Sequence, residues 1–180
     1  MSIIKLVHTA LSDSDIWKIL GHETKITKYS ELSQFKYLDQ LLPKPIDYCV
    51  ILYEDNVDHG HWVGLSRYAG KYEHFDNYGL KPDKELEWVN MKQRKSLHGN
   101  EAYLSNLLKP KGFVYNNVRY QQSDAGFNTC GSHVVHRLYR LKTQDMDLDA
   151  YRNFMLTLKE DFNTSYDIIV AEFIQKYFPK

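Results

Sequence analysis

A polar loop joins a predicted strand to a predicted helix in the segment Tyr120-Gln121-Gln122-Ser123-Asp124-Ala125-Gly126-Phe127-Asn128-Thr129-Cys130-Gly131. The pattern of residues 112–120 before it is typical of a strand. After it, apolar residues recur at spacings of three and four, with no proline or glycine between Gly131 and Leu141, which predicts a helix that begins at Cys130. The chain therefore carries a thiol into the first turn of a helix, directly after a polar loop.

That position favours a reactive thiol at Cys130. Thr129 or Asn128 is placed to cap the helix, and the unpaired N–H groups and dipole of a first turn favour an anion. They lower the pKa of a thiol from about 8.5. Gly131 leaves room beside the sulfur for a substrate backbone. A free cysteine is more often a small buried apolar residue, so Cys130 alone does not decide the function.

Upstream, residues 61–68 and 71–77 have the pattern of a β-hairpin around Ala69-Gly70. A two-residue loop pairs Tyr68 with Lys71 and fixes the register of both strands. A three-residue loop would shift that register by one and turn every side chain of one strand to the other face.

With the two-residue loop, Asp76 lies opposite Val63 and on the same face as His61. Diagonal neighbours are about 7 Å apart at Cβ, within reach of a hydrogen bond between imidazole and carboxylate. Asn77 points to the other face, so we favour Asp76 as the residue that orients His61. Trp62 also lies on the other face, as part of the core or as a shield over the site. A histidine on a strand is commonly just exposed, so His61 also needs its partners.

Gln121 and Gln122 precede Cys130 by nine and eight residues. A side-chain amide is no general base, but it can donate to a developing oxyanion, where one donor contributes about 2.7 to 4 kcal/mol. We favour Gln121 because it stands at the end of the predicted strand, and Gln122 remains the alternative. Taken singly, either residue is also an ordinary part of a polar loop.

The whole chain, residues 1–180, is predicted to be one α+β domain. The apolar run of residues 48–53 suits a central strand that is buried on both faces. We expect a central mixed sheet of about four to five strands flanked by helices, with the predicted nucleophile at the N-terminus of a central helix. The remaining helices are predicted at residues 12–20, 32–42, 84–91, 100–108, 147–158 and 165–178.

Composition narrows the classes of function. Lys plus Arg and Asp plus Glu number 23 each, so we expect at most weak contact with nucleic acid. Cys49 and Cys130 are too few for a cysteine zinc site or a disulfide scaffold. His133 and His136 lack a fourth ligand, so we expect no metal and no cofactor. No apolar run nears 18 residues, and residues 1–8 do not resemble a secretion signal, so we expect a soluble intracellular protein without membrane contact.

The order His, acid, Gln, Cys resembles the cysteine endopeptidases of the adenovirus protease (adenain) and SUMO protease type. In that family a His-Trp pair comes first, an acid or Asn follows 15 to 20 residues later, and a Gln precedes a Cys-Gly pair at a helix start. His61-Trp62, Asp76 and Cys130-Gly131 match over residues 48–140. The gap from Gln to Cys is longer here than the usual six or seven residues.

The resemblance implies a fold related to papain and a role for each residue. His61 would be the base, Asp76 would orient it, Cys130 would attack, and Gln121 with the Cys130 N–H would hold the oxyanion. Trp62, Gly131 and Gln122 would contact the substrate. The adenovirus enzyme also uses a disulfide-linked peptide and DNA, but Cys49 does not match that linkage, so we do not expect such activation.

The short length and residues 128–135 look most like the viral branch of this family, found in large DNA viruses and virophages. The resemblance implies a monomer that cleaves capsid or core precursor proteins near small residues such as Gly, in the cytoplasm of the infected host cell (virus factory) and in the virion. Two alternatives stay open. One is an isopeptidase for ubiquitin-like modifiers (deSUMOylase or deubiquitinase) of the same fold, and the other is a catalytically inactive binding module.

Overall fold

A computed structural model of the chain describes residues 2–56, 59–97, 101–122 and 126–178. Its sheet has five strands in the order β1-β2-β3-β4-β5. The central strand β3 runs antiparallel to both β2 and β4, whereas β1 and β5 run parallel to their neighbours at the two edges. The predicted α+β class with a mixed central sheet is confirmed. The strands are β1 (Lys25–Lys28), β2 (Tyr48–Asn56), β3 (His59–Tyr68), β4 (Lys71–Phe75) and β5 (Val114–Tyr115).

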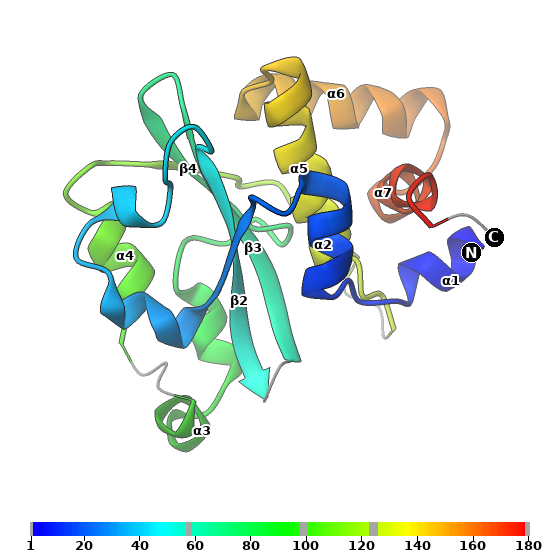
Figure 1. Cartoon of the computed structure of the whole chain (residues 1–180). Coiled ribbons are helices and arrows are strands. Elements are labelled where there is room, and N and C mark those ends of the chain that lie inside the picture. The colour runs from blue at the N-terminus through cyan, green and yellow to red at the C-terminus, as the bar shows by residue number, and fades with distance from the viewer. Residues whose placement is uncertain (1, 57–58, 98–100, 123–125, 179–180) are drawn as a thin grey trace.

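Helices cover both faces of this sheet, as Figure 1 shows. One face carries α1 (Ile3–Val7), α2 (Asp13–Leu20), α5 (Cys130–Gln144), α6 (Leu148–Asp161) and α7 (Tyr166–Gln175). The other face carries the 3-10 helices η1 (Tyr29–Gln34), η2 (Leu38–Gln40) and η3 (Lys84–Trp88), and the short helices α3 (Met91–Ser96) and α4 (Tyr103–Leu108). Within the described ranges, no helix has the length and apolar character needed to cross a membrane.

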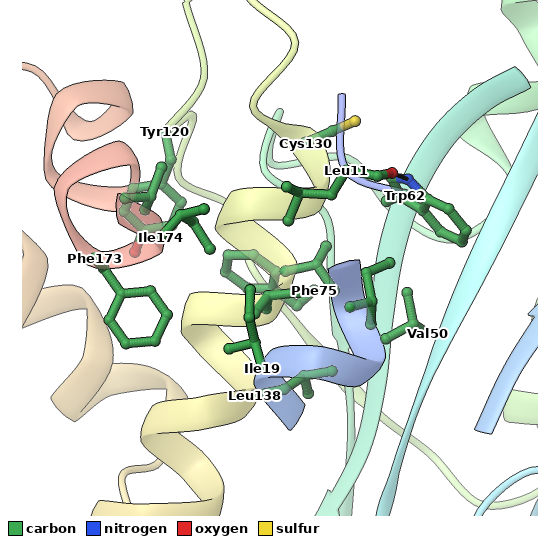
Figure 2. Packing of buried hydrophobic residues seen from close by; sticks show 14 of the residues in the cluster. Leu11, Ile19, Val50, Trp62, Phe75, Tyr120, Cys130, Leu138, Phe173 and Ile174 are labelled. Carbon is green, nitrogen blue, oxygen red and sulfur yellow. Dashed lines mark hydrogen bonds between the residues drawn. The ribbon is translucent and has the colours of Figure 1, made fainter. Parts of the chain in front are cut away.

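The hydrophobic core is divided by the sheet into two clusters. On β2, Val50 and Leu52 face the cluster around α5, while Cys49, Ile51 and Tyr53 face the cluster around η1 and α4. Because successive side chains of β2 point to opposite faces, this one strand contributes residues to both clusters. The prediction that the strand is buried on both faces is confirmed. Figure 2 shows the first cluster, in which residues from α2, β2, β4, α5 and α7 meet.

The hairpin of β3 and β4 has the predicted two-residue loop. Tyr68 pairs with Lys71, and the register continues without a shift to Gly64 opposite Phe75. Ala69 and Gly70 both have positive φ, at 47° and 77°. This is the backbone twist that two-residue hairpin loops require, and Gly70 adopts it without a steric cost.

Three elements differ from the prediction in the first half of the chain. Residues 25–28 form a strand, and in place of a continuous helix at residues 32–42 the chain forms η1 and η2, with Leu41 and Leu42 beyond the end of η2. The side chain of Gln40 accepts hydrogen bonds from the N–H groups of Lys36 and Tyr37, which closes a turn where a helix was expected. Leu32 and Leu38 still reach the core, so tertiary packing satisfies the apolar pattern without a regular helix.

Two further predictions of secondary structure were too long. The strand expected at residues 112–120 is limited to β5, because the side chain of Asn116 bonds the backbone of Asp76 and Val118 in place of a ladder. The helix expected at residues 84–91 is the shorter η3. The helix expected at 100–108 is α4, although Asn100 itself lies outside the described residues. The helices predicted from 130, 147 and 165 form as α5, α6 and α7.

Candidate active site

Cys130 is the first residue of α5, as predicted, and it is 8% exposed. Figure 2 shows its sulfur at the start of the helix, beside Leu11 and Trp62. Thr129 occupies the cap position, but its hydroxyl donates to Asp167 and does not accept a helix N–H. Thr129 is thus the N-cap residue, one of the two predicted for this position, without a side-chain hydrogen bond to the helix. The N–H groups of the first turn keep their capacity to bind an anion.

His61 of β3 and Asp76, the first residue after β4, form a buried hydrogen bond of 2.6 Å between Nε2 and Oδ1. A carboxylate can only accept, so Nε2 donates and Nδ1 remains for another partner. The second carboxylate oxygen of Asp76 accepts from the N–H of Leu80 at 2.8 Å. His61 also interacts with the Cys130 thiol, and this interaction lowers the pKa of Cys130. The structure therefore brings Cys130, His61 and Asp76 together in series.

These contacts shift the pKa of each group in the direction of an ion pair. Burial by itself lowers the pKa of His61, but its interactions with Asp76 and Cys130 outweigh it and raise that pKa to about 10. Burial raises the pKa of the Cys130 thiol, but His61 and the N–H groups of Trp62 and Gly131 bring it below its ordinary value. Both shifts favour a thiolate paired with an imidazolium over the neutral thiol and imidazole.

The ring of His61 is held by aromatic side chains. Tyr78 stacks on it with ring centroids 5.2 Å apart, and Trp88 of η3 meets it edge-on, also at 5.2 Å. Trp88 is itself 53% exposed, so it lies between the imidazole and solvent. The hairpin register predicts Tyr78 opposite His61, in agreement with this stacking, whereas Trp88 was not predicted as a neighbour of His61. The exposure of a large aromatic side chain beside the site is visible only in the structure.

Gln121 is buried, and its amide is fixed at both ends. Its Oε1 accepts from Asn77 Nδ2 at 2.6 Å, and its Nε2 donates to the carbonyl of Phe127 at 2.9 Å. An amide nitrogen has two N–H groups, so one donor remains. The side chain of Gln122 is exposed, although its backbone N–H donates to Asp167 at 3.1 Å. Asn77 thus holds Gln121, while its neighbour Asp76 holds His61.

A groove of about 600 Å³ opens on the thiol. Trp62 and Leu11 form its wall at Cys130, where the indole N–H donates to the Leu11 carbonyl at 3.0 Å. A Cβ at Gly131 would lie 3.1 Å from both Leu11 and Trp62, so the passage beside the sulfur is narrow. Trp62 is buried on the face opposite His61, as predicted from the register. The contribution of Leu11 and of the start of α2 to the groove was not predicted.

Glu85 of η3 lies beside the His61–Asp76 pair, and ligand atoms of these three residues lie within 4.8 Å of one another. Glu85 is only 2% exposed, and neither carboxylate oxygen has a hydrogen-bond partner among the described residues. Burial, and then the charge of Asp76, raises its pKa to about 8. We therefore interpret Glu85 as a neutral acid at pH 7. The nearby ring nitrogen of His61 and carboxylate oxygen of Asp76 are already hydrogen-bonded to each other. The role of Glu85 in the site was not predicted.

The two histidines of α5 have other partners within the protein. Nε2 of His133 lies 3.2 Å from Asp167, and Nδ1 of His136 lies 2.8 Å from the Tyr151 hydroxyl. Nε2 of His136 accepts from Arg140 at 3.2 Å. With these polar contacts, both histidines are structural residues of the core around α5.

Fold and site together describe an α+β protein that keeps a thiol, an imidazole and a carboxylate in one buried series at the start of a helix. No family model matches the chain. In sequence it is similar to "Uncharacterized protein V9" of Sputnik virophage, with 29% identity over 165 residues, 90% of this chain and 92% of that protein. In fold it is similar to the C-terminal Ulp1 protease domain solved in complex with Smt3, the yeast ortholog of SUMO. That likeness has a TM-score of 0.39 and 14% identity, over 99% of this chain and 82% of that one. The activity therefore has to be argued from the site itself.

Proposed function

We propose that this protein is a cysteine endopeptidase in which Cys130 is the nucleophile. The observation that carries the proposal is the buried series Cys130–His61–Asp76, with the thiol facing a groove. A cysteine that served only as a core residue would have its pKa raised by burial, as it is for Cys49, to about 12. The lowered pKa of Cys130, which is also buried but faces a groove, supports a chemical role.

In the proposed reaction the Cys130 thiolate attacks the carbonyl carbon of the scissile peptide bond. The imidazolium of His61 donates its proton to the leaving amine, so the first product departs neutral and a thioester remains. Neutral His61 then takes a proton from water, the hydroxide attacks the thioester, and the Cys130 thiolate departs beside the protonated His61, which restores the starting pair. Asp76 holds the tautomer of His61 and stabilises the imidazolium in both steps.

The negative charge that develops on the carbonyl oxygen needs donors. We assign this task to the N–H of Cys130 and to Gln121, because the amide of Gln121 is held rigid by Asn77 and Phe127 and keeps one N–H. Gln122 has an exposed side chain and is the weaker candidate for this role. We place Gln122, with Trp62 and Gly131, among the residues that contact the substrate.

The narrow passage at Cys130 supports a substrate with small residues, such as Gly, next to the scissile bond. The 29% identical relative from a virophage supports a viral setting. We propose that the substrates are capsid or core precursor proteins and that cleavage takes place in the cytoplasm of the infected cell (virus factory) and in the virion. Removal of a ubiquitin-like modifier with a Gly-Gly end would suit the same passage and is the second candidate.

The proposal is tested by co-expression of the protein with candidate virion proteins and identification of new protein termini by mass spectrometry. New termini beside small residues should appear with the wild type and with Cys49→Ala, and disappear with Cys130→Ala. Identical fragments with and without the Cys130 thiol would overturn the proposal and favour a binding module. Cleavage confined to a ubiquitin or SUMO fusion, with virion proteins intact, would favour the isopeptidase.

A further inference from the structure

Asp167 lies in the first turn of α7 and is fully buried. Its partners include Gln122 and Thr129, which flank the loop before Cys130. Its Oδ1 accepts from the hydroxyl of Thr129 and from Nε2 of His133, the latter at 3.2 Å. Its Oδ2 accepts from the backbone N–H of Gln122 at 3.1 Å. A single carboxylate thus receives three hydrogen bonds from residues that are 34 to 45 positions away in the chain.

These donors belong to the two segments on which the proposed mechanism depends. Gln122 follows Gln121, the assigned oxyanion donor, and Thr129 precedes the nucleophile Cys130. His133 lies one turn further along α5. The carboxylate therefore ties together the two ends of the loop between residues 122 and 129. A second connection is the hydrogen bond from Nε2 of Gln121, just before this loop, to the carbonyl of Phe127 near its other end.

We propose that Asp167 is a positioning residue, through which helix α7 holds the oxyanion donor and the nucleophile at a fixed separation. The inference rests on the proposed function, because it assigns Asp167 a part in the same reaction without contact to substrate. A shift of about 1 Å between reacting groups can cost about 100-fold in rate, so one shared anchor for both segments matters.

An ionised carboxylate is suited to this task. Burial raises the pKa of Asp167, but the hydrogen bonds from His133, Thr129 and Gln122 bring it below its ordinary value, so the group is charged at neutral pH. An anion accepts from all three donors at once. An asparagine has one acceptor oxygen and an NH₂ group, and that NH₂ would face one of the donors. Asp167→Asn therefore keeps the shape of the side chain and breaks the shared anchor.

The test compares wild type and Asp167→Asn on a fluorogenic peptide amide that ends in Gly-Gly, with the concentration of active sites measured by iodoacetamide titration. We expect kcat per site to fall at least about tenfold, with KM within about twofold, because Asp167 touches no substrate. Iodoacetamide needs no oxyanion donor, so the rate of alkylation at Cys130 should stay within about threefold of wild type.

Tyr151→Phe is the matched control for a loss of stability alone. It removes a buried 2.8 Å hydrogen bond to His136, on the same helix α5 but further from its start. We expect a lower melting temperature and an unchanged kcat per site. A parallel pair of variants tests the same anchor from the other side: Thr129→Val should lower kcat as Asp167→Asn does, and Thr129→Ser, which keeps the hydroxyl, should recover most of it.

An unchanged kcat per site in Asp167→Asn and Thr129→Val would overturn the inference. So would a loss of kcat that Tyr151→Phe reproduces, because the effect would then follow stability. If Asp167→Asn does not fold, Thr129→Val decides. A wild type that leaves the peptide intact would instead contradict the proposed function, so the two failures can be told apart.

Discussion

His61 and Asp76 lie 15 residues apart in the chain, and their side chains form a buried hydrogen bond of 2.6 Å. The distance follows from the hairpin: Tyr68 pairs with Lys71 across a two-residue loop, and β4 ends at Phe75, directly before Asp76. A change of one residue in this loop would turn Asp76 to the other face of the sheet. The local register of one hairpin therefore determines whether the imidazole has a carboxylate partner.

We expect Asp76→Asn to narrow the pH range of activity. Asp76 helps raise the pKa of His61 to about 10, and in the proposed reaction His61 must be protonated to release the leaving amine. In the wild type, kcat/KM should therefore fall as the pH rises through about 10, and in the variant it should fall at a lower pH. The pH profile of kcat/KM on a Gly-Gly peptide amide measures this. Asp55→Asn is the control, because it removes the partner of an exposed histidine, His59, 2.7 Å away. A profile that Asp76→Asn leaves unmoved would count against the assigned role.

Glu85→Gln should change the pH dependence of stability. The pKa of Glu85 in the folded protein is about 8, above the ordinary 4.5, so between these values the folded state binds more protons than the unfolded state. Its contribution to stability is then present below about pH 4.5 and is lost as the pH rises towards 8. The variant should gain on the order of 3 kcal/mol over wild type at pH 8 relative to pH 4.5.

Urea denaturation at the two pH values measures the free energy of unfolding for this comparison. Glu87→Gln is the matched control, because Glu87 lies on the same 3-10 helix with an exposed side chain, in a surface ion pair with Lys84. It should shift both values equally. If Glu85→Gln does the same, the carboxyl is already ionised in the folded protein.

Gly131→Ala tests the narrow passage beside the thiol. The added Cβ would lie 3.1 Å from Leu11 and Trp62, so one of them must move by a few tenths of an ångström. We expect kcat/KM for the Gly-Gly peptide amide to fall at least about tenfold, since small displacements in the groove disturb substrate alignment. The small reagent iodoacetamide should still alkylate Cys130. Equal hydrolysis by variant and wild type would show that the passage does not limit substrate entry.

Gln121→Ala and Gln122→Ala distinguish the two candidate oxyanion donors. Loss of one such donor lowers kcat by about 100- to 1,000-fold, and we expect this loss for Gln121, whose amide is buried and fixed. Gln122→Ala should act mainly on KM, since we place its side chain in contact with substrate. Steady-state kinetics at pH 7 gives both constants. The reverse pattern would assign the donor to Gln122.

Local patterns in the sequence were enough for the centre of the site. Ala69-Gly70 set the hairpin register, and the apolar spacing after Gly131 placed Cys130 at a helix start; both features depend on residues close in the chain. The prediction of Gln121 as oxyanion donor depends on its place at the end of the strand expected at residues 112–120. In the structure this strand is limited to Val114–Tyr115. The fixed geometry of the Gln121 amide comes from Asn77, 44 residues away.

What the sequence did not reveal depends on contacts between distant segments. The wall that Leu11 forms at Trp62 spans 51 residues, and the anchor of Asp167 at Gln122 spans 45. The carboxylate of Glu85 has no hydrogen-bond partner among the described residues and lies 3.8 Å from Nε2 of His74, so no motif marks it as part of the site. The continuous helix predicted at residues 32–42 was wrong for another reason. The apolar residues between Tyr29 and Leu42 have a pattern typical of a helix, but they pack into the core from 3-10 turns.

The proposal that Cys130 is the nucleophile is tested most directly by covalent labelling of the wild-type protein with a short peptide that ends in a Gly-Gly vinyl methyl ester. Peptide mass mapping then identifies the modified residue. We predict modification of Cys130 and not of Cys49, whose thiol is fully buried with a pKa of about 12. His61→Ala should slow the reaction at least about 100-fold, because the thiolate loses its partner. Labelling of Cys130 that is as fast without His61, or an unreactive wild type, would contradict the account.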